Sequence, residues 1–188
     1  MLTGCYGGTA APTEGPEGQA SEALSTDFCP AGVPAALAPG ADQTIRSHFT
    51  GTGVQIYMCN ATTTGYAWTF VAPQANLTNA EGTLIGTHFI GPTWQGNDAS
   101  SVVGAKVAGV TIDATAVPWL LLKATSNSGD GRFSDVTSIQ RLSTVGGIAP
   151  STVCDATNLG AIAQVPYTAE YVFYKTTARA KVKQCAGG

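Results

Sequence analysis

The residue types best suited to chemistry gather in one stretch of the chain, from Gly82 to Gln95. This stretch holds His88 and Trp94, and a polar turn that contains Asp98 follows it. Near neutral pH an imidazole can act as a general base or bind a metal ion, and an indole can stack on a ligand. We therefore expect any ligand-binding site to use His88, Trp94, Gln95 and Asp98.

The sequence gives little support to catalysis. Only His48 and His88 could activate a nucleophile, and the chain has no G-x-S-x-G elbow. His88 is in phase with Leu84 and Ile90 on an expected strand, so we interpret it as an inward, hydrogen-bonded histidine. A metal or catalytic role for His88 is the alternative, although its spacing matches no standard site. We expect no cofactor and no catalytic residue, and we leave open whether the protein is an enzyme.

Aromatic residues make binding the best-supported class of function. Trp68 and Trp119 lie within strand patterns and are expected in the core. Trp94 follows Gly-Pro-Thr and precedes a polar turn, so a core position and an exposed binding position are both open for it. Aromatic platforms suit sugar rings and small apolar ligands. The expected partner is an unidentified small molecule, a glycan or a surface protein.

The charge pattern excludes nucleic acid as a partner. The chain has 9 Lys and Arg against 12 Asp and Glu, and no block of like charge. Arg141 stands in this weakly charged context, where we expect a structural ion pair with Asp135 or Asp155. Low charge with many small hydroxylated residues suits an extracellular β protein.

Short strand patterns separated by turn signals predict an all-β fold. Residues 53–59 alternate, with Val54 and Ile56 on one face and Gln55 and Tyr57 on the other. Residues 117–124 are apolar on both faces, which predicts a central strand buried on both sides. The other strand candidates are residues 43–49, 66–71, 84–90, 101–110, 133–142, 165–174 and 178–185.

No convincing amphipathic helix interrupts these candidates. A sandwich, a jelly roll or a barrel would accommodate them. We predict a single-domain antiparallel β-sandwich or jelly roll with a disordered N-terminal tether.

The N-terminal part differs in composition from the rest. Residues 2–5, Leu-Thr-Gly-Cys, resemble the lipobox of bacterial lipoproteins, in which the cysteine is lipidated. The charged and apolar parts of a signal peptide do not precede them, so a chance free thiol at Cys5 is the alternative. We divide the chain into residues 1–5 (remnant of a lipoprotein signal), 6–28 (flexible linker) and 29–188 (β domain). This predicts an extracellular or cell-envelope protein that contacts a membrane only through a lipid anchor.

The cysteines also point to an oxidising compartment. Besides Cys5, the chain contains Cys29, Cys59, Cys154 and Cys185 at wide spacings that fit no zinc pattern. Four cysteines allow three pairings, and their spacing alone does not choose among them.

Six sequence blocks occur in an order that resembles a known family. The series resembles a family of secreted bacterial and fungal proteins catalogued as a domain of unknown function, over residues 41–175. The resemblance implies an exported β domain without an established activity. Some members carry a malate-dehydrogenase label, which this sequence does not support because no G-x-G-x-x-G motif follows a strand. The blocks are GVQIYMC (53–59), AWTFVAPQA (67–75), THF (87–89), PWLLL (118–122), IQRLSTVGGIAP (139–150) and VPYTAEYVFY (165–174).

The resemblance also favours one disulfide pairing. Cys59 and Cys154 fall inside the shared region, whereas Cys29 and Cys185 lie outside it. We therefore expect the bridges Cys59–Cys154 and Cys29–Cys185.

The expected function is that of an exported cell-surface domain with a binding or structural role. One alternative is a secreted enzyme or mononuclear metal-binding protein that uses His88. Another is a subunit that self-assembles into a surface layer or fibre.

Overall fold

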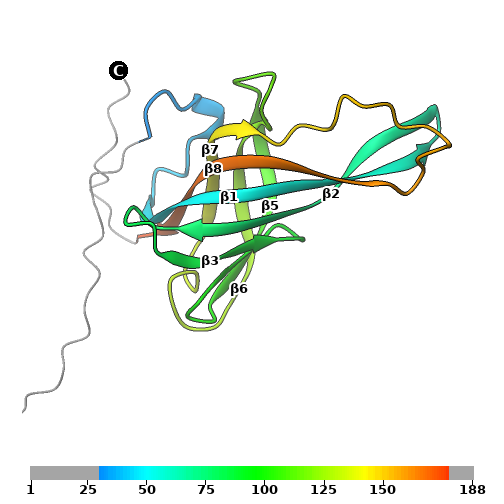
Figure 1. The fold of residues 1–188 in the computed structure, drawn as a ribbon. Coiled ribbons are helices and arrows are strands. Elements are labelled where there is room, and N and C mark those ends of the chain that lie inside the picture. Colours follow the sequence, from blue (N-terminus) through cyan, green and yellow to red (C-terminus); the bar gives the residue numbers. More distant parts are fainter. Residues whose placement is uncertain (1–29, 178–188) are drawn as a thin grey trace, which may run out of the picture.

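A single antiparallel sheet of eight strands closes into a barrel in the computed structural model, which describes residues 30–177 (Figure 1). Each strand pairs with the next along the chain, and β8 returns to pair with β1. The all-β antiparallel fold is confirmed, but one closed sheet replaces the two packed sheets of a sandwich or jelly roll. The strands are β1 (Gln43–Thr62), β2 (Gly65–Thr78), β3 (Leu84–Phe89), β4 (Thr93–Gly96), β5 (Ser101–Val110), β6 (Trp119–Ser128), β7 (Ser138–Gly146) and β8 (Ile162–Thr176), preceded by a 3-10 turn, η1 (Ala35–Leu37).

Strand β1 joins two predicted strands into one of 20 residues. The predicted strands 43–49 and 53–59 are continuous, because β8 pairs with β1 along both halves. A Cβ atom on Gly51 would lie 2.5 Å from Cε2 of Tyr171, and one on Gly53 would lie 2.0 Å from the Gln74 carbonyl oxygen. These glycines therefore allow close packing inside a continuous strand.

Strand β2 likewise continues through Pro73, where we expected it to end. Its pairing with β3 covers only Ala75–Thr78, so from Gly65 to Gln74 it pairs with β1 alone and is an edge strand. Proline is tolerated on an edge because no neighbour there needs its N–H group. A register shift opposite Ile56 and Tyr57 adds one residue to β2 close to this proline.

The outer ends of β1 and β2 extend past the barrel as an arm, formed by residues 57–70 (Figure 1). The connection from β7 to β8 runs out to this arm before β8 returns to the barrel. A disulfide joins Cys59 on β1 to Cys154 in that connection, and Trp68 Nε1 donates to the Thr152 carbonyl oxygen over 2.9 Å. The predicted Cys59–Cys154 bridge is confirmed.

Two apolar clusters explain the strand patterns. The larger fills the barrel with aromatic and aliphatic side chains, among them Trp94, Phe133 and Phe173. The smaller lies on the outer face of β7 and β8, where Leu142, Val172 and Tyr174 pack with residues such as Val33 and Trp119. Leu37 of η1 is buried, and its carbonyl oxygen accepts a hydrogen bond from Gln140 Nε2 over 2.6 Å.

Strand β6 is therefore not the central layer that residues 117–124 predicted. Its side chains Leu120 and Leu122 face the barrel interior. Trp119 packs on the outer cluster instead, which is why the sequence is apolar on both faces. Most of the strand is only half-buried or exposed.

Several predictions concern residues outside 30–177, including the linker, Cys5 and the Cys29–Cys185 bridge. Within the described range, no helix has the length and apolar character that crossing a membrane requires.

Removing the Cys59–Cys154 bridge should destabilise the domain. The bridge closes a loop of 95 residues, so the double variant Cys59→Ser/Cys154→Ser should lose about 4 kcal/mol of unfolding free energy through a less restricted unfolded chain. Urea unfolding followed by circular dichroism measures this. An unchanged midpoint and slope would show that the bridge does not constrain the unfolded chain.

Candidate functional site

The centre of the site is a stacked pair of rings on two short neighbouring strands. His88 on β3 and Trp94 on β4 are direct cross-strand partners, so both side chains lie on the same face of the sheet. Their ring centroids are 4.3 Å apart and the ring planes differ by 7°. His88 is 3% exposed and Trp94 is 1% exposed. The sequence prediction of an inward histidine is thus consistent with the structure, but the apolar residues in phase with it are not inward: Leu84 is 48% exposed and Ile90 is 62% exposed.

The close approach of β3 and β4 depends on small residues. Gly86 pairs with Gly96, and a Cβ atom on Gly86 would lie 2.1 Å from the Gln95 carbonyl oxygen. Gly91 has a φ of 90° in the turn between the strands, a conformation that other residues rarely adopt. The glycines around His88 and Trp94 therefore fix the register that stacks the two rings.

His88 is held as a neutral imidazole with a defined tautomer. Its Nδ1 lies 2.8 Å from the Thr93 carbonyl oxygen. Because a carbonyl oxygen only accepts, Nδ1 carries the proton and Nε2 is left as an acceptor. Burial lowers the pKa of His88 from 6.5 to about 3, which outweighs the opposing hydrogen bond to Thr93, and the positive charge of Arg141 lowers it further.

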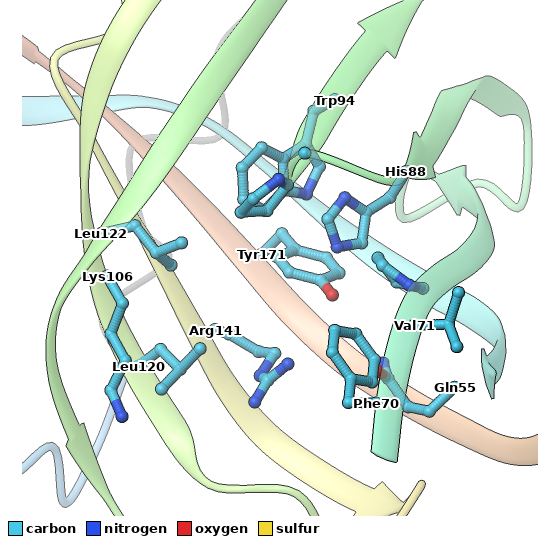
Figure 2. A pocket seen from close by; sticks show the side chains of 13 residues that line it. Gln55, Phe70, Val71, His88, Trp94, Lys106, Leu120, Leu122, Arg141 and Tyr171 are labelled. Carbon is cyan, nitrogen blue, oxygen red and sulfur yellow. The ribbon is translucent and has the colours of Figure 1, made fainter. Parts of the chain in front are cut away.

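A cavity of about 150 Å³ opens beside these rings. Figure 2 shows Trp94 and His88 at one side of it, Arg141 and Lys106 at another, and Tyr171 between them. The buried lining residues form the inner end, whereas exposed residues such as Phe70 surround the opening. The lining consists of Gln55, Phe70, Val71, Pro73, His88, Gly91, Pro92, Trp94, Lys106, Leu120, Leu122, Arg141 and Tyr171.

Two buried donors in this lining make no hydrogen bond of normal geometry within the described residues. They are Gln55 Nε2 and Trp94 Nε1, each on a side chain that is 1% exposed. The Gln55 side chain also interacts with the Tyr167 hydroxyl group, which lowers the pKa of Tyr167 against the larger effect of burial. A buried polar group without a hydrogen bond costs about 1–3 kcal/mol, and few occur in a folded protein. Both donors belong to residues that line one cavity, and neither has an acceptor at hydrogen-bonding geometry in the described part of the protein.

The charged residues of the cavity are both cationic. Arg141 donates from Nε and Nη2 to the Pro118 carbonyl oxygen over 3.1 and 2.8 Å. This corrects the expected ion pair with Asp135 or Asp155, because Asp135 binds Arg46 at 2.9 Å instead. The described lining contains no Asp or Glu to neutralise Arg141 and Lys106.

Tyr171 contributes a neutral hydroxyl group to the cavity. Its ring is fully buried and packs edge-to-face against both His88 and Trp94. Burial raises the pKa of Tyr171 well above 10.0. The hydroxyl groups of Tyr171 and Tyr167 lie 3.1 Å apart, so each can bond the other without ionising.

The structure separates the four predicted binding residues into two groups. His88 and Trp94 line the cavity together, whereas Gln95 is exposed on the opposite face of β4. Asp98 accepts from Ser100 N and Oγ over 3.1 and 2.6 Å and from Arg132 N and Nε over 3.0 and 3.1 Å. Its carboxylate thus stabilises a loop outside the cavity lining.

Trp68 and Trp119 do not lie in the barrel core where they were expected, and Trp94, for which both positions were open, does. Trp94 is the most buried, while Trp68 and Trp119 are only half-buried. Trp68 lies on the arm beyond the barrel, and Trp119 lies on the outer cluster. The strand patterns alone could not show that β2 extends past the barrel interior, or that β6 turns the apolar side chain of Trp119 outward.

Sequence reasoning missed Gln55, Arg141 and Tyr171 as lining residues. One signal was present: the alternation of residues 53–59 placed Gln55 and Tyr57 on a common face, and this is the face that is buried. A buried glutamine on the inner face of a strand indicates a polar site in the interior.

The described part of the chain offers no set of ligands for the alternative role of His88 in binding a metal ion. Between residues 30 and 177, no three His, Cys, Asp or Glu side chains come together in a group that could hold a metal ion.

One family model matches the chain. It is described as "Protein of unknown function (DUF3455)" and covers residues 39–175. This range agrees with residues 41–175, over which the ordered blocks resemble a family of unknown function. No curated protein and no solved structure matches the chain.

Acid should weaken the fold through His88. Its pKa is about 3 in the folded protein against 6.5 when unperturbed, so the unfolded chain binds more protons between these pH values. The contribution of His88 to stability is therefore complete above pH 6.5 and should fall by up to about 1.4 kcal/mol per pH unit below it. Imidazole ¹⁵N shifts should show neutral His88, protonated at Nδ1, from pH 7 to pH 5. An imidazolium signal from His88 above pH 5 would contradict this.

Proposed function

The chain belongs to the DUF3455 family of proteins of unknown function, and we propose that it binds a small molecule inside the barrel. The observation that carries the proposal is the pair of unpartnered donors, Gln55 Nε2 and Trp94 Nε1, beside one cavity. A ligand with an acceptor group would satisfy them when it displaces water.

The size and walls of the cavity support a ligand of about one ring. A cavity of 150 Å³ is of the size that holds benzene when its walls are apolar. Leu120, Leu122 and the rings of Trp94 and Tyr171 provide such walls. Barrel interiors and their openings are common sites for small ligands.

The lining favours binding over catalysis. Among residues 30–177, the lining has no Ser, Thr or Cys as a nucleophile and no Asp or Glu as a general acid or base. His88 has a pKa of about 3, which makes it a weak base at neutral pH. We therefore assign the cavity a binding role.

We place this binding role outside the cytoplasm. The Cys59–Cys154 disulfide supports an oxidising compartment. A lipid anchor on Cys5 would hold the domain at the cell envelope, with residues 6–28 as the linker.

Fragments of one six-membered ring should bind beside Trp94. Phenol, benzamide and benzoate provide neutral and anionic probes, and binding should be on the order of 1 mM or tighter. The measurement is the ¹⁵N–¹H signal of the Trp94 indole, assigned with Trp94→Phe. This signal should shift on titration while that of Trp68, on the arm, stays constant.

Filling the cavity provides the control. Leu120→Trp should block fragment binding, whereas Val153→Trp adds the same side chain to an exposed position and should not. Val71→Trp at the opening serves as a second blocking variant if Leu120→Trp fails to fold. Absence of any Trp94 shift, or fragment binding that both blocking variants leave unchanged, would refute the proposed binding site.

A second candidate function is self-assembly through the arm. From Gly65 to Gln74, strand β2 has no neighbour on its outer side in the described structure. Tyr66, Phe70 and Val71 expose apolar surface along this stretch. An open edge with apolar side chains can pair with the same edge of another copy.

Light scattering after size-exclusion chromatography tests the assembly candidate. Ala67→Lys places a charge on the open edge and should reduce the apparent mass at high concentration. Thr87→Lys is the matched control, because Thr87 is exposed but pairs on both sides. A wild-type protein that stays monomeric at millimolar concentration would rule out assembly through this edge.

A further inference from the structure

We propose that the ligand is a small carboxylate, with its anionic group facing Arg141 and its apolar body against Trp94 and Leu122. This inference rests on the proposed function and specifies the class of ligand. The donors, the charges and the walls of the cavity support it separately.

The unpartnered groups set the polarity of the ligand. Gln55 Nε2 and Trp94 Nε1 are both donors, and an indole nitrogen can only donate. A ligand that satisfies them must present acceptor atoms. A carboxylate presents two oxygens and accepts several hydrogen bonds at once, and such charge-assisted bonds are stronger than neutral ones.

The charged side chains of the cavity determine the sign of the charge that the ligand carries. Arg141 lies on the cavity wall with its guanidinium among the labelled side chains of Figure 2, and Lys106 lies near the opening. Arg141 contacts the Pro118 carbonyl oxygen through Nε and Nη2, and its side chain also interacts with the Tyr171 hydroxyl group, another lining residue of the cavity. No carboxylate of the described lining competes for either cation.

The remaining walls set the size of the apolar body. Trp94, Leu120, Leu122 and Tyr171 surround the inner part of the cavity. A volume of about 150 Å³ accommodates a single ring or a short chain. A long acyl chain or an oligosaccharide would exceed this volume.

Benzoate and benzamide differ in charge but hardly in shape, so they test the inference directly. Benzoate should bind about 10-fold more tightly than benzamide, since hydrogen bonds to a charged group are the stronger class. Calorimetry gives the affinities, and the Trp94 indole signal shows that binding occurs in the cavity. Inorganic phosphate, which lacks an apolar body, should leave the Trp94 signal unchanged up to 10-fold above the benzoate Kd.

Charge variants locate the interaction. Arg141→Gln should remove most of the preference for benzoate over benzamide, and Lys106→Gln should reduce it about 3-fold. Lys106→Gln changes an exposed side chain, so it remains informative if Arg141→Gln unfolds. Lys123→Gln is the matched control, because it removes the same charge from an exposed site outside the cavity.

The outcomes separate this inference from the proposed function. If benzamide shifts the Trp94 signal with an affinity equal to or above that of benzoate, the cavity binds ligands but the anion assignment is wrong. A benzoate preference that Lys106→Gln and Arg141→Gln leave intact would also overturn the assignment. If no probe shifts Trp94, both the assignment and the proposed function fail.

Discussion

The pairing of β1 with β8 is the constraint on which the rest of the structure depends. It closes the sheet along most of both strands, from Gln43 opposite Thr176 to Met58 opposite Ile162. Closure directs one face of every strand into a single interior, which side chains must then fill. Gly51 leaves room for the Tyr171 ring, and that ring in turn packs against the stacked His88 and Trp94. The site is thus a direct consequence of how the barrel closes.

The interior is packed unevenly, and the uneven part is the candidate site. Phe49, Phe133 and Phe173 pack ring against ring in one part of the interior. The other part contains the cavity beside Trp94, where β2 has separated from β3 and only the arm continues. Native proteins usually depart from complete packing and complete hydrogen bonding where function requires it. Unpartnered donors at Gln55 and Trp94 are such a departure.

Much of the fold could be predicted from local patterns, because strand periodicity and turn residues are local properties. The approximate strand positions follow from residues near each other in sequence, and the Cys59–Cys154 bridge follows from the ordered blocks. The phase argument for an inward His88 was right in its outcome only, because Leu84 and Ile90, the residues in phase with it, are exposed. Closure of the sheet could not be predicted from local patterns, because it depends on the pairing of β1 and β8, which come from opposite ends of the domain. Residues 43–49 and 53–59 were predicted as separate strands, although Gly51 and Gly53 allow close packing within one strand.

The candidate site was predictable only in part for the same reason. His88 and Trp94 are six residues apart and meet across a hairpin, so a local reading could join them. Gln55, Arg141 and Tyr171 come from distant strands, and only the closed barrel brings them to one cavity. Apolar character was also a poor guide to which side chains face the barrel interior. Trp119 faces an outer cluster, while the polar Gln55 faces the interior.

We infer that the barrel interior is a ligand site for small carboxylates. A crystal structure of the protein grown with benzoate tests it most directly. We expect benzoate beside Trp94 and Leu122, with a carboxylate oxygen in hydrogen-bonding distance of Arg141 and of Trp94 Nε1 or Gln55 Nε2. Well-defined density that shows the cavity closed by protein side chains, or benzoate bound only elsewhere on the surface, would contradict it.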